Sequence, residues 1–243
     1  MLLILLPGLD GSGQLFEPLI NELPSALTAH ALSYPSEGDQ TYDELLTHVR
    51  PALPKAEPFL LLGWSFSGPL ALMVAASPPS NLRGVILCAS FESNPHPALG
   101  WLAPIATPPL FRAFPFFSQA KALLGGYSNP VMRRQLAEAH AQAGPAALAK
   151  RTRQVLRLPH TDLAKNCKVP ILYLAGTRDA VVPRRNAAAI KRSAPTAQIV
   201  DIPGPHLLLL THPAIAAKAI ASFAAVQSDA QPLIAADAEL VRR

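Results

Sequence analysis

The stretch Phe59–Leu72, FLLLGWSFSGPLAL, decides the fold. An apolar run typical of a buried strand is followed almost at once by an Ala- and Leu-rich run typical of a helix. So short a connection strains its central residue and raises the Ser65 hydroxyl at the carboxyl end of a sheet, as in the nucleophile-elbow motif Gly-x-Ser-x-Gly. Here Ser67 replaces the second glycine, with Gly68 directly behind it. An ordinary strand, turn and helix would look similar, so the motif needs partners.

Strand and helix alternate on both sides of this stretch. This order predicts an α/β fold with a doubly wound, mostly parallel sheet covered by helices on both faces. The expected strands cover residues 2–6, 28–33, the run before Gly63, 82–89, 169–175 and 198–202, and the expected helices lie near 16–23, 42–53, after Pro69, 186–193 and 213–225.

The alternation stops at Ser93, where prolines interrupt an aromatic, apolar stretch. Two helical segments follow, near residues 131–142 and 146–158. We therefore expect a helical lid inserted between two core strands, and residues 93–160 are called the lid segment below. The expected core comprises residues 1–92 and 161–226, and the polar residues 227–243 are expected to form a loosely docked tail.

Composition bounds the class of protein. A chain of 243 residues, half of them hydrophobic, can bury one substantial core. Cys88 and Cys167 have no spacing that suggests a disulfide or a metal site, so reduced thiols are expected. The apolar start, Met1–Leu6, lacks the basic flank and cleavage pattern of a signal peptide, and no run is long enough to span a bilayer. We expect a cytoplasmic monomer that needs no metal or cofactor and does not contact a membrane.

The net charge of +5 is concentrated in one part of the chain. Between Ser93 and Lys168 there are ten Lys and Arg residues against two Asp and Glu residues. This excess favours an acidic partner or substrate. Nucleic acid is not expected, because no binding motif is present and few aromatic residues lie among the basic ones.

A serine hydroxyl becomes a good nucleophile only when a base takes its proton and a third group orients that base. In a doubly wound sheet, these partners belong on loops at the carboxyl ends of later strands. Asp179 follows the strand 169–175, and His206 follows the strand 198–202. The order Ser65, Asp179, His206 is the one that the elbow motif predicts.

Other residues compete for these roles. Glu92, just beyond the strand 82–89, is an alternative acid. His212 precedes Pro213 and is expected to cap the last helix. His96, His140 and His160, in the lid segment, are expected at the surface or beside the substrate rather than in catalysis. For His30 and His48 the sequence suggests no partner.

An oxyanion that forms at the attacked carbonyl needs preorganised N–H donors. One is expected to be the backbone N–H of Phe66, at the start of the elbow helix. The other is expected from the glycine-rich loop after the first strand, Pro7–Gly11, with the Leu9 N–H as the better candidate.

These motifs together resemble the α/β-hydrolase superfamily over nearly the whole chain, and within it the pimeloyl-ACP methyl ester carboxylesterases of biotin synthesis. The residues that carry the resemblance are Gly63-Trp64-Ser65, Tyr173, Asp179–Arg184, His206 and His212-Pro213. The chain departs from that pattern at Ser67, at Pro7 in place of the histidine of the oxyanion loop, and in having no strand before Leu2. The resemblance implies a serine carboxylesterase with a helical lid.

The lid segment supplies candidate substrate and partner contacts. Trp64 beside the nucleophile, with Phe111, Phe114 and other apolar lid residues (Trp101, Leu102, Ile105, Leu110, Phe116 and Phe117), is expected either to line an acyl pocket or to pack the lid onto the core. Lys150, Arg153 and Arg157 recur at helical spacing and predict a basic stripe, to which Arg133, Arg134 and Arg151 add. Such a surface suits an acidic acyl carrier protein that presents an ester.

The sequence therefore predicts a serine esterase that hydrolyses a carboxylic ester, and a methyl ester in particular. Three alternatives use the same triad: a general small-ester esterase, a thioesterase and a carbon–carbon bond hydrolase. A ligand-binding protein that keeps the fold without catalysis is the alternative from a different class.

Overall fold

The computed structural model describes residues 1–113 and 116–229, and the side chains of residues 116–119 and 229 lie outside this description. At its centre is a six-stranded sheet in the order β2-β1-β3-β4-β5-β6. Every neighbouring pair of strands is parallel, so the predicted fold class is confirmed. The strands are β1 (Leu2–Leu6), β2 (Thr28–Ala31), β3 (Phe59–Trp64), β4 (Leu82–Cys88), β5 (Ile171–Gly176) and β6 (Gln198–Ile202).

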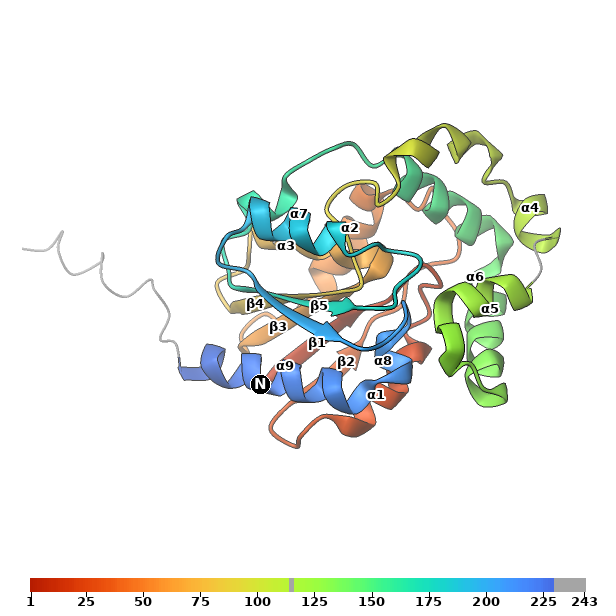
Figure 1. The fold of residues 1–243 in the computed structure, drawn as a ribbon. Helices are drawn as coiled ribbons and strands as arrows, with labels where there is room; N and C mark the ends of the chain where they lie inside the picture. The colour runs from red at the N-terminus through yellow and green to blue at the C-terminus, as the bar shows by residue number, and fades with distance from the viewer. Residues whose placement is uncertain (114–115, 230–243) are drawn as a thin grey trace, which may run out of the picture.

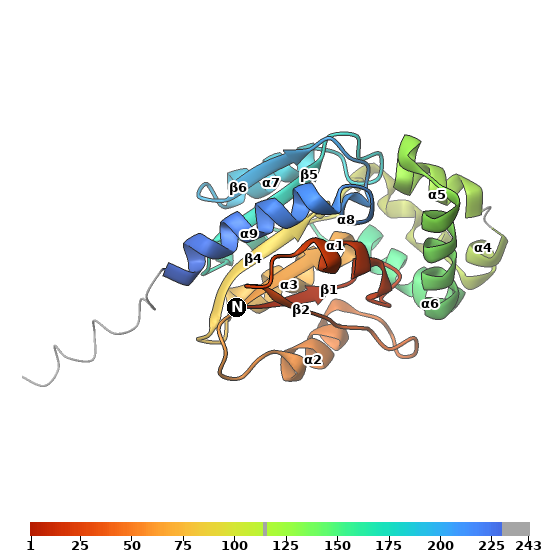
Figure 2. The same cartoon turned by 90° about the horizontal axis from the view of Figure 1, so that it is seen from below.

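Helices cover both faces of the sheet (Figures 1 and 2), and apolar residues of the strands pack against them alternately on one face and the other. In β1, Leu3 and Leu5 join the hydrophobic cluster with α1, α8 and α9, whereas Ile4 and Leu6 join the cluster with α2, α3 and α7. Burial on both faces explains why the strands read as continuous apolar runs. The covering helices are α1 (Glu17–Glu22), α2 (Tyr42–Ala52), α3 (Gly68–Ala76), α7 (Arg185–Ser193), α8 (Leu208–Thr211) and α9 (Pro213–Asp229).

Between β4 and β5 the chain leaves the sheet and forms the helices of the lid segment. Figure 2 shows α4, α5 and α6 gathered beyond one end of the sheet. The longest, α6, is broken at Gly144, whose φ of +74° is not helical. This break separates the two helical segments expected from the sequence. The elements are a 3₁₀ helix at Pro97–Ile105, α4 (Pro108–Ala113), α5 (Phe116–Leu124), a 3₁₀ turn at Gly125–Tyr127 and α6 (Pro130–Arg157).

Strands β2, β4 and β5 differ from the expected bounds by one or two residues at one or both ends, and two further details concern the helices. The prolines of the lid segment do not exclude helix, because Pro97 and Pro108 stand at the first position of a helical element, where no N–H bond is lost. The last helix, α9, continues through Asp229 into the predicted tail, and Gln227 is buried against the core. Residues 230–243 lie outside the described residues.

The described part of the chain also bears on the other expectations from composition. None of its helices has both the length and the apolar character needed to cross a membrane. It contains no cluster of three His, Cys, Asp or Glu residues that could hold a metal ion. Cys88 and Cys167 are free thiols, and burial raises the pKa of both.

Candidate active site

The elbow forms where β3 ends and α3 begins. Ser65 has a φ of +50°, in the left-handed region that non-glycine residues rarely adopt. The turn is so tight that a Cβ atom on Gly63 would lie 2.5 Å from the Ser67 carbonyl oxygen. The strained serine and its small neighbour are therefore those that the short connection requires.

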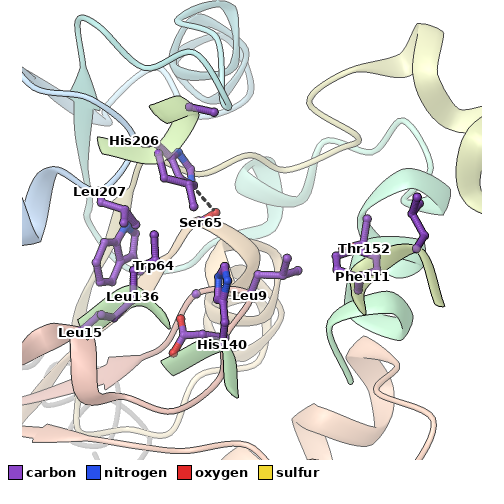
Figure 3. Close-up of a pocket in the computed structure, with 15 residues that line it drawn as sticks. Leu9, Leu15, Trp64, Ser65, Phe111, Leu136, His140, Thr152, His206 and Leu207 are labelled. Atoms are coloured by element: carbon purple, nitrogen blue, oxygen red, sulfur yellow. Dashed lines mark hydrogen bonds between the residues drawn. The ribbon is translucent and has the colours of Figure 1, made fainter. Parts of the chain in front are cut away.

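Three side chains from three different strand ends meet beside this turn. The His206 Nε2 atom lies 2.9 Å from the Ser65 Oγ atom, and the His206 Nδ1 atom lies 2.9 Å from the Asp179 Oδ2 atom. The side chains of His206 and Asp179 are 4% and 2% exposed. Figure 3 shows the imidazole above the serine hydroxyl, with the hydrogen bond dashed. The structure thus brings together the three residues that the chain order predicts.

The Asp179 carboxylate is oriented by its own loop. Its Oδ1 atom accepts hydrogen bonds from the backbone N–H groups of Val181 and Val182, each at 2.8 Å. The second oxygen is left to accept from the Nδ1–H of His206. In that tautomer the Nε2 atom carries a lone pair toward Ser65 and can take the proton of its hydroxyl.

A buried chain of hydrogen bonds supports the backbone of the elbow from below. The Ser90 hydroxyl donates to the Ser65 carbonyl at 2.6 Å, and the Tyr173 hydroxyl donates to the Ser90 carbonyl at 2.6 Å. Burial raises the pKa of Tyr173, so its hydroxyl stays protonated and remains a donor. Sequence reasoning noted Tyr173 only through the family resemblance and missed Ser90, which has no motif of its own.

The two expected oxyanion donors lie beside Ser65. Leu9 is in a tight turn closed by a hydrogen bond from the Gly11 N–H to the Gly8 carbonyl, at 3.0 Å. Phe66 is in the first helical turn after Ser65, where backbone N–H groups have no partner within the helix. Among the backbone hydrogen bonds between elements of the described residues, neither N–H is a donor.

A largely apolar cavity of about 440 Å³ opens onto Ser65 and His206 (Figure 3). Trp64 and Phe111 line it, as the sequence suggested, whereas Trp101 is 71% exposed and faces solvent. The side chain of Phe114 lies outside the described residues. The remaining apolar lining comes from Leu15, Leu110, Ala122, Leu123, Leu136 and Leu207.

Three polar residues stand on the cavity wall: Asp10, His140 and Thr152. The sequence offered a place at the surface or beside the substrate for His140, whereas it did not single out Asp10 or Thr152. Burial lowers the pKa of His140, and the charge of Asp10 opposes that shift to a smaller extent. The spacing of His140 from Leu136, four residues along the same helix, is the one signal that could have placed it on the inner face.

The residues considered as alternatives to Asp179 and His206 do not contact the triad in the described structure. The Glu92 carboxylate accepts hydrogen bonds from the Ala164 N–H and the Ser193 hydroxyl, so it does not reach His206. The His212 carbonyl accepts from the Ala216 N–H at 3.2 Å, as a cap of α9 does. The other histidines outside the cavity are His96, which bonds the Val181 carbonyl, and the exposed His30, His48 and His160.

The basic residues of α6 do not form a uniform exposed stripe. The inclusion of Arg151 in that stripe is wrong, because its side chain is fully buried and bonds to loops of the core. Lys150 bonds the Gly38 carbonyl, and Arg153 bonds the Ala106 carbonyl. The rest are Arg133, which bonds Ser128, Arg134, which is paired with Glu138, and Arg157, which is exposed.

Curated proteins of similar sequence carry one name. A pimeloyl-acyl-carrier-protein methyl ester esterase of Xanthomonas campestris pv. campestris is 30% identical over 246 residues, covering 92% of this chain and 94% of the relative. A protein of the same name from Neisseria meningitidis is 27% identical over 202 residues, covering 77% of this chain and 79% of the relative.

Solved structures show the same fold at lower sequence identity. A thermophilic esterase from Thermogutta terrifontis superposes with a TM-score of 0.79 at 20% identity, covering 93% of this chain and 90% of the other. An enol-lactonase from Burkholderia xenovorans superposes with a TM-score of 0.77 at 15% identity, covering 92% and 91%. The model of the alpha/beta hydrolase family matches residues 3–219. The chain is a hydrolase that belongs to the alpha/beta hydrolase family.

Proposed function

We propose that the protein is a serine carboxylesterase that works through an acyl-serine intermediate. Ser65 attacks the ester carbonyl, and His206 takes the hydroxyl proton and then gives it to the leaving alcohol. Asp179 holds the imidazole in the tautomer this requires. The observation that carries the proposal is the continuous pair of 2.9 Å contacts from Ser65 through His206 to Asp179, at the mouth of an apolar cavity.

The tetrahedral intermediate needs donors for its oxyanion, and we assign the N–H groups of Leu9 and Phe66 to that role. Leu9 lines the same cavity as Ser65, and Phe66 directly follows Ser65 in the chain, which supports the assignment, as does the lack of a competing acceptor among their described backbone bonds. Water then attacks the acyl-serine with His206 as base, and the same donors stabilise the second oxyanion.

For the substrate we propose a methyl ester of a pimeloyl-type acyl chain carried on acyl carrier protein. The names of the curated relatives support this choice. The apolar lining of the cavity and the excess of basic residues on the lid segment are compatible with an acyl chain that leads to an acidic carrier. The basic residues assigned to carrier docking are Arg133, Arg134, Lys150, Arg153 and Arg157.

The experiment is turnover of a panel of methyl esters, each supplied free and linked to acyl carrier protein, by the wild type and Ser65→Ala. We expect the wild type to favour a carrier-linked ester and Ser65→Ala to lose activity by a factor on the order of 10⁶. The wild type should also be labelled by a fluorophosphonate, and Ser65→Ala should not. An unlabelled wild type without turnover would instead favour a ligand-binding protein.

The same panel separates the alternatives that share the triad. A preference for free short esters would indicate a general esterase, and a preference for thioesters or vinylogous diketones would indicate a thioesterase or a carbon–carbon bond hydrolase.

Charge reversal on the lid tests the carrier. Arg157→Glu should lower turnover of the carrier-linked ester relative to that of the free ester, and the loss should shrink as salt increases. Arg83→Glu, a reversal at the start of β4 outside the lid segment, is the matched control and should leave that ratio unchanged. Equal ratios in both variants would reject carrier docking on the lid.

A further inference from the structure

Arg151 is the one charged side chain among the largest fully buried residues of the described chain. It extends from the second half of α6, in the lid segment, to loops at the carboxyl ends of β1 and β2. A guanidinium is costly to bury unless its N–H groups are all but fully paired. Its partners therefore indicate what the residue is for.

Those partners are four acceptors on two different loops. The Nη1 group donates to the carbonyls of Leu9 and Asp10, at 3.0 and 2.8 Å. The Nη2 group donates to the Pro35 carbonyl at 2.9 Å, and the Nε group donates to the Gln40 side-chain carbonyl at 2.8 Å. Two of the four acceptors thus belong to the turn that carries the proposed oxyanion donor.

The bonds leave this turn little freedom. Its first peptide, which contains the Leu9 N–H, is oriented by the bond from the Gly11 N–H to the Gly8 carbonyl. Its next two peptides have their carbonyls on Arg151. Because the N–H and C=O of a planar peptide point in opposite directions, a held carbonyl fixes the direction of its N–H. All three peptides of the turn are therefore fixed, two of them by a residue of the lid.

The surrounding residues fit the guanidinium closely. A Cβ atom on Gly11 would lie 2.2 Å from the Nη1 atom of Arg151, and the φ of Gly11 is +70°. The Cζ atom of the Arg151 guanidinium lies over the Tyr34 ring, 5.5 Å from the ring centroid. The hydroxyl of Tyr34 bonds the Ser67 hydroxyl, which in turn bonds the Pro7 carbonyl at the start of the same loop. Ser67, the residue that departs from the elbow motif, thus bonds to the first residue of the Pro7–Gly11 loop, whereas Arg151 bonds to Leu9 and Asp10 of that loop.

We propose that Arg151 is a positioning residue for catalysis: from the lid segment, it holds the Gly8–Gly11 turn so that the Leu9 N–H is aimed at the developing oxyanion. This inference rests on the proposed function. It implies that the oxyanion site is complete only while α6 is docked on the core. Docking of the lid and stabilisation of the transition state are then coupled through one side chain.

Two substitutions test the proposal with a small soluble ester as substrate. Arg151→Lys keeps the positive charge but cannot make the forked contacts, and Arg151→Ala removes them altogether. We expect kcat to fall about 10-fold in the first variant and about 100-fold in the second, with KM changed less than 3-fold, because the lost interaction acts on the transition state. Added methylguanidinium, at millimolar concentration, should restore part of the activity of Arg151→Ala.

Arg50→Ala is the matched control. Arg50 also donates to two backbone carbonyls, those of Ser77 and Met73, but lies on α2 away from the cavity. Its kcat should equal that of the wild type, and methylguanidinium should have no effect on it. Circular dichroism at the assay temperature verifies that each variant is folded.

Several outcomes would overturn the inference. A folded Arg151→Lys with wild-type kcat would do so, as would a change confined to KM. If Arg151→Ala does not fold, the kcat of Arg151→Lys decides alone. The Ser65→Ala variant distinguishes failure of the proposed function from failure of the role of Arg151. If Ser65→Ala stays active, the proposed function is wrong. If Ser65→Ala is inactive and Arg151→Lys has wild-type kcat, only the role of Arg151 is rejected.

Discussion

The carboxyl ends of the strands, called the sheet edge below, and the lid segment hold the candidate site by different means. At the sheet edge, strand order alone places Ser65, His206 and Asp179 on neighbouring loops, and apolar alternation on each strand keeps those strands in register. The lid segment packs apolar residues of α5 and α6 into the core, and it is also attached by side chains that bond backbone carbonyls of the core, as Arg151 does on the Gly8–Gly11 turn. The first kind of attachment leaves a sequence pattern, and the second does not.

The loop that carries His206 shows the same contrast. The loop follows β6, which determines where it lies in the fold, and residues of the lid segment also form hydrogen bonds to it. The Leu207 N–H donates to the Leu123 carbonyl of α5 at 3.0 Å, and the Tyr127 hydroxyl donates to the Pro203 carbonyl at 2.8 Å. Both the proposed base and the proposed oxyanion donor are thus within one residue of a lid contact.

The largest expected effect lies at the sheet edge. Asp179→Asn keeps the shape of the loop but presents an amide to His206, which favours the wrong tautomer, so kcat should fall by about 10⁴-fold. Steady-state kinetics with a soluble ester measure this. A loss below 10-fold in a folded variant would mean that a different acid, or none, acts with His206.

The second prediction compares how much a leucine side chain contributes to the free energy of unfolding in the sheet and in the lid segment. Leu62→Ala in β3 removes a fully buried side chain and should lower the free energy of unfolding by about 2–5 kcal/mol. Leu110→Ala in the lid segment, where the side chain is 40% exposed, should cost less than about 1 kcal/mol. Urea titrations give both values. Equal losses would show that the lid is as tightly built as the core.

A smaller effect is expected from removing a hydrogen bond between the lid segment and the loop that carries His206. Tyr127→Phe removes the hydrogen bond to Pro203 and the one that the Tyr127 hydroxyl accepts from Arg178, and it leaves the ring in contact with His212, so it should cost about 1–2 kcal/mol of stability. We expect a fall in kcat of a few-fold if that bond helps to hold His206. Unchanged kcat at reduced stability would limit the contact to a structural role.

The smallest expected effect is a pH dependence from the cavity wall. Burial lowers the pKa of His140 below its ordinary value of 6.5, so on acidification the unfolded chain takes up this proton first. His140 therefore contributes a loss of stability as the pH falls below that value. In urea titrations between pH 7.5 and pH 5.5, His140→Gln should lose less stability than the wild type. Parallel curves would mean that this histidine titrates normally.

Much of the sheet edge could be predicted from the sequence. The bounds of β1 and β6 coincide with those expected, because apolar runs between turn residues define buried strands well. The convergence of Ser65, Asp179 and His206 followed from a rule of topology, that loops at the carboxyl ends of parallel strands lie together.

The lid contacts could not be predicted in the same way. Arg151 has basic residues on both sides of it in the sequence, and arginine is usually exposed, so composition favoured a solvent-facing position. Its burial depends on carbonyl acceptors at Leu9, Asp10 and Pro35, and a backbone carbonyl has no side-chain signature. Thr152 on the cavity wall was missed for a related reason, since this part of the wall forms only when α6 packs onto the core.

The break at Gly144 divides α6 into two halves that both line the cavity. The first half contributes Leu136 and His140 to the wall, and the second half contributes Thr152 and also carries Arg151 to the Gly8–Gly11 turn. Residues before the glycine can therefore be varied while Arg151 and the residues around it are left unchanged. A library restricted to the first half is thus a route to a reshaped cavity wall that keeps the contacts of Arg151 in place.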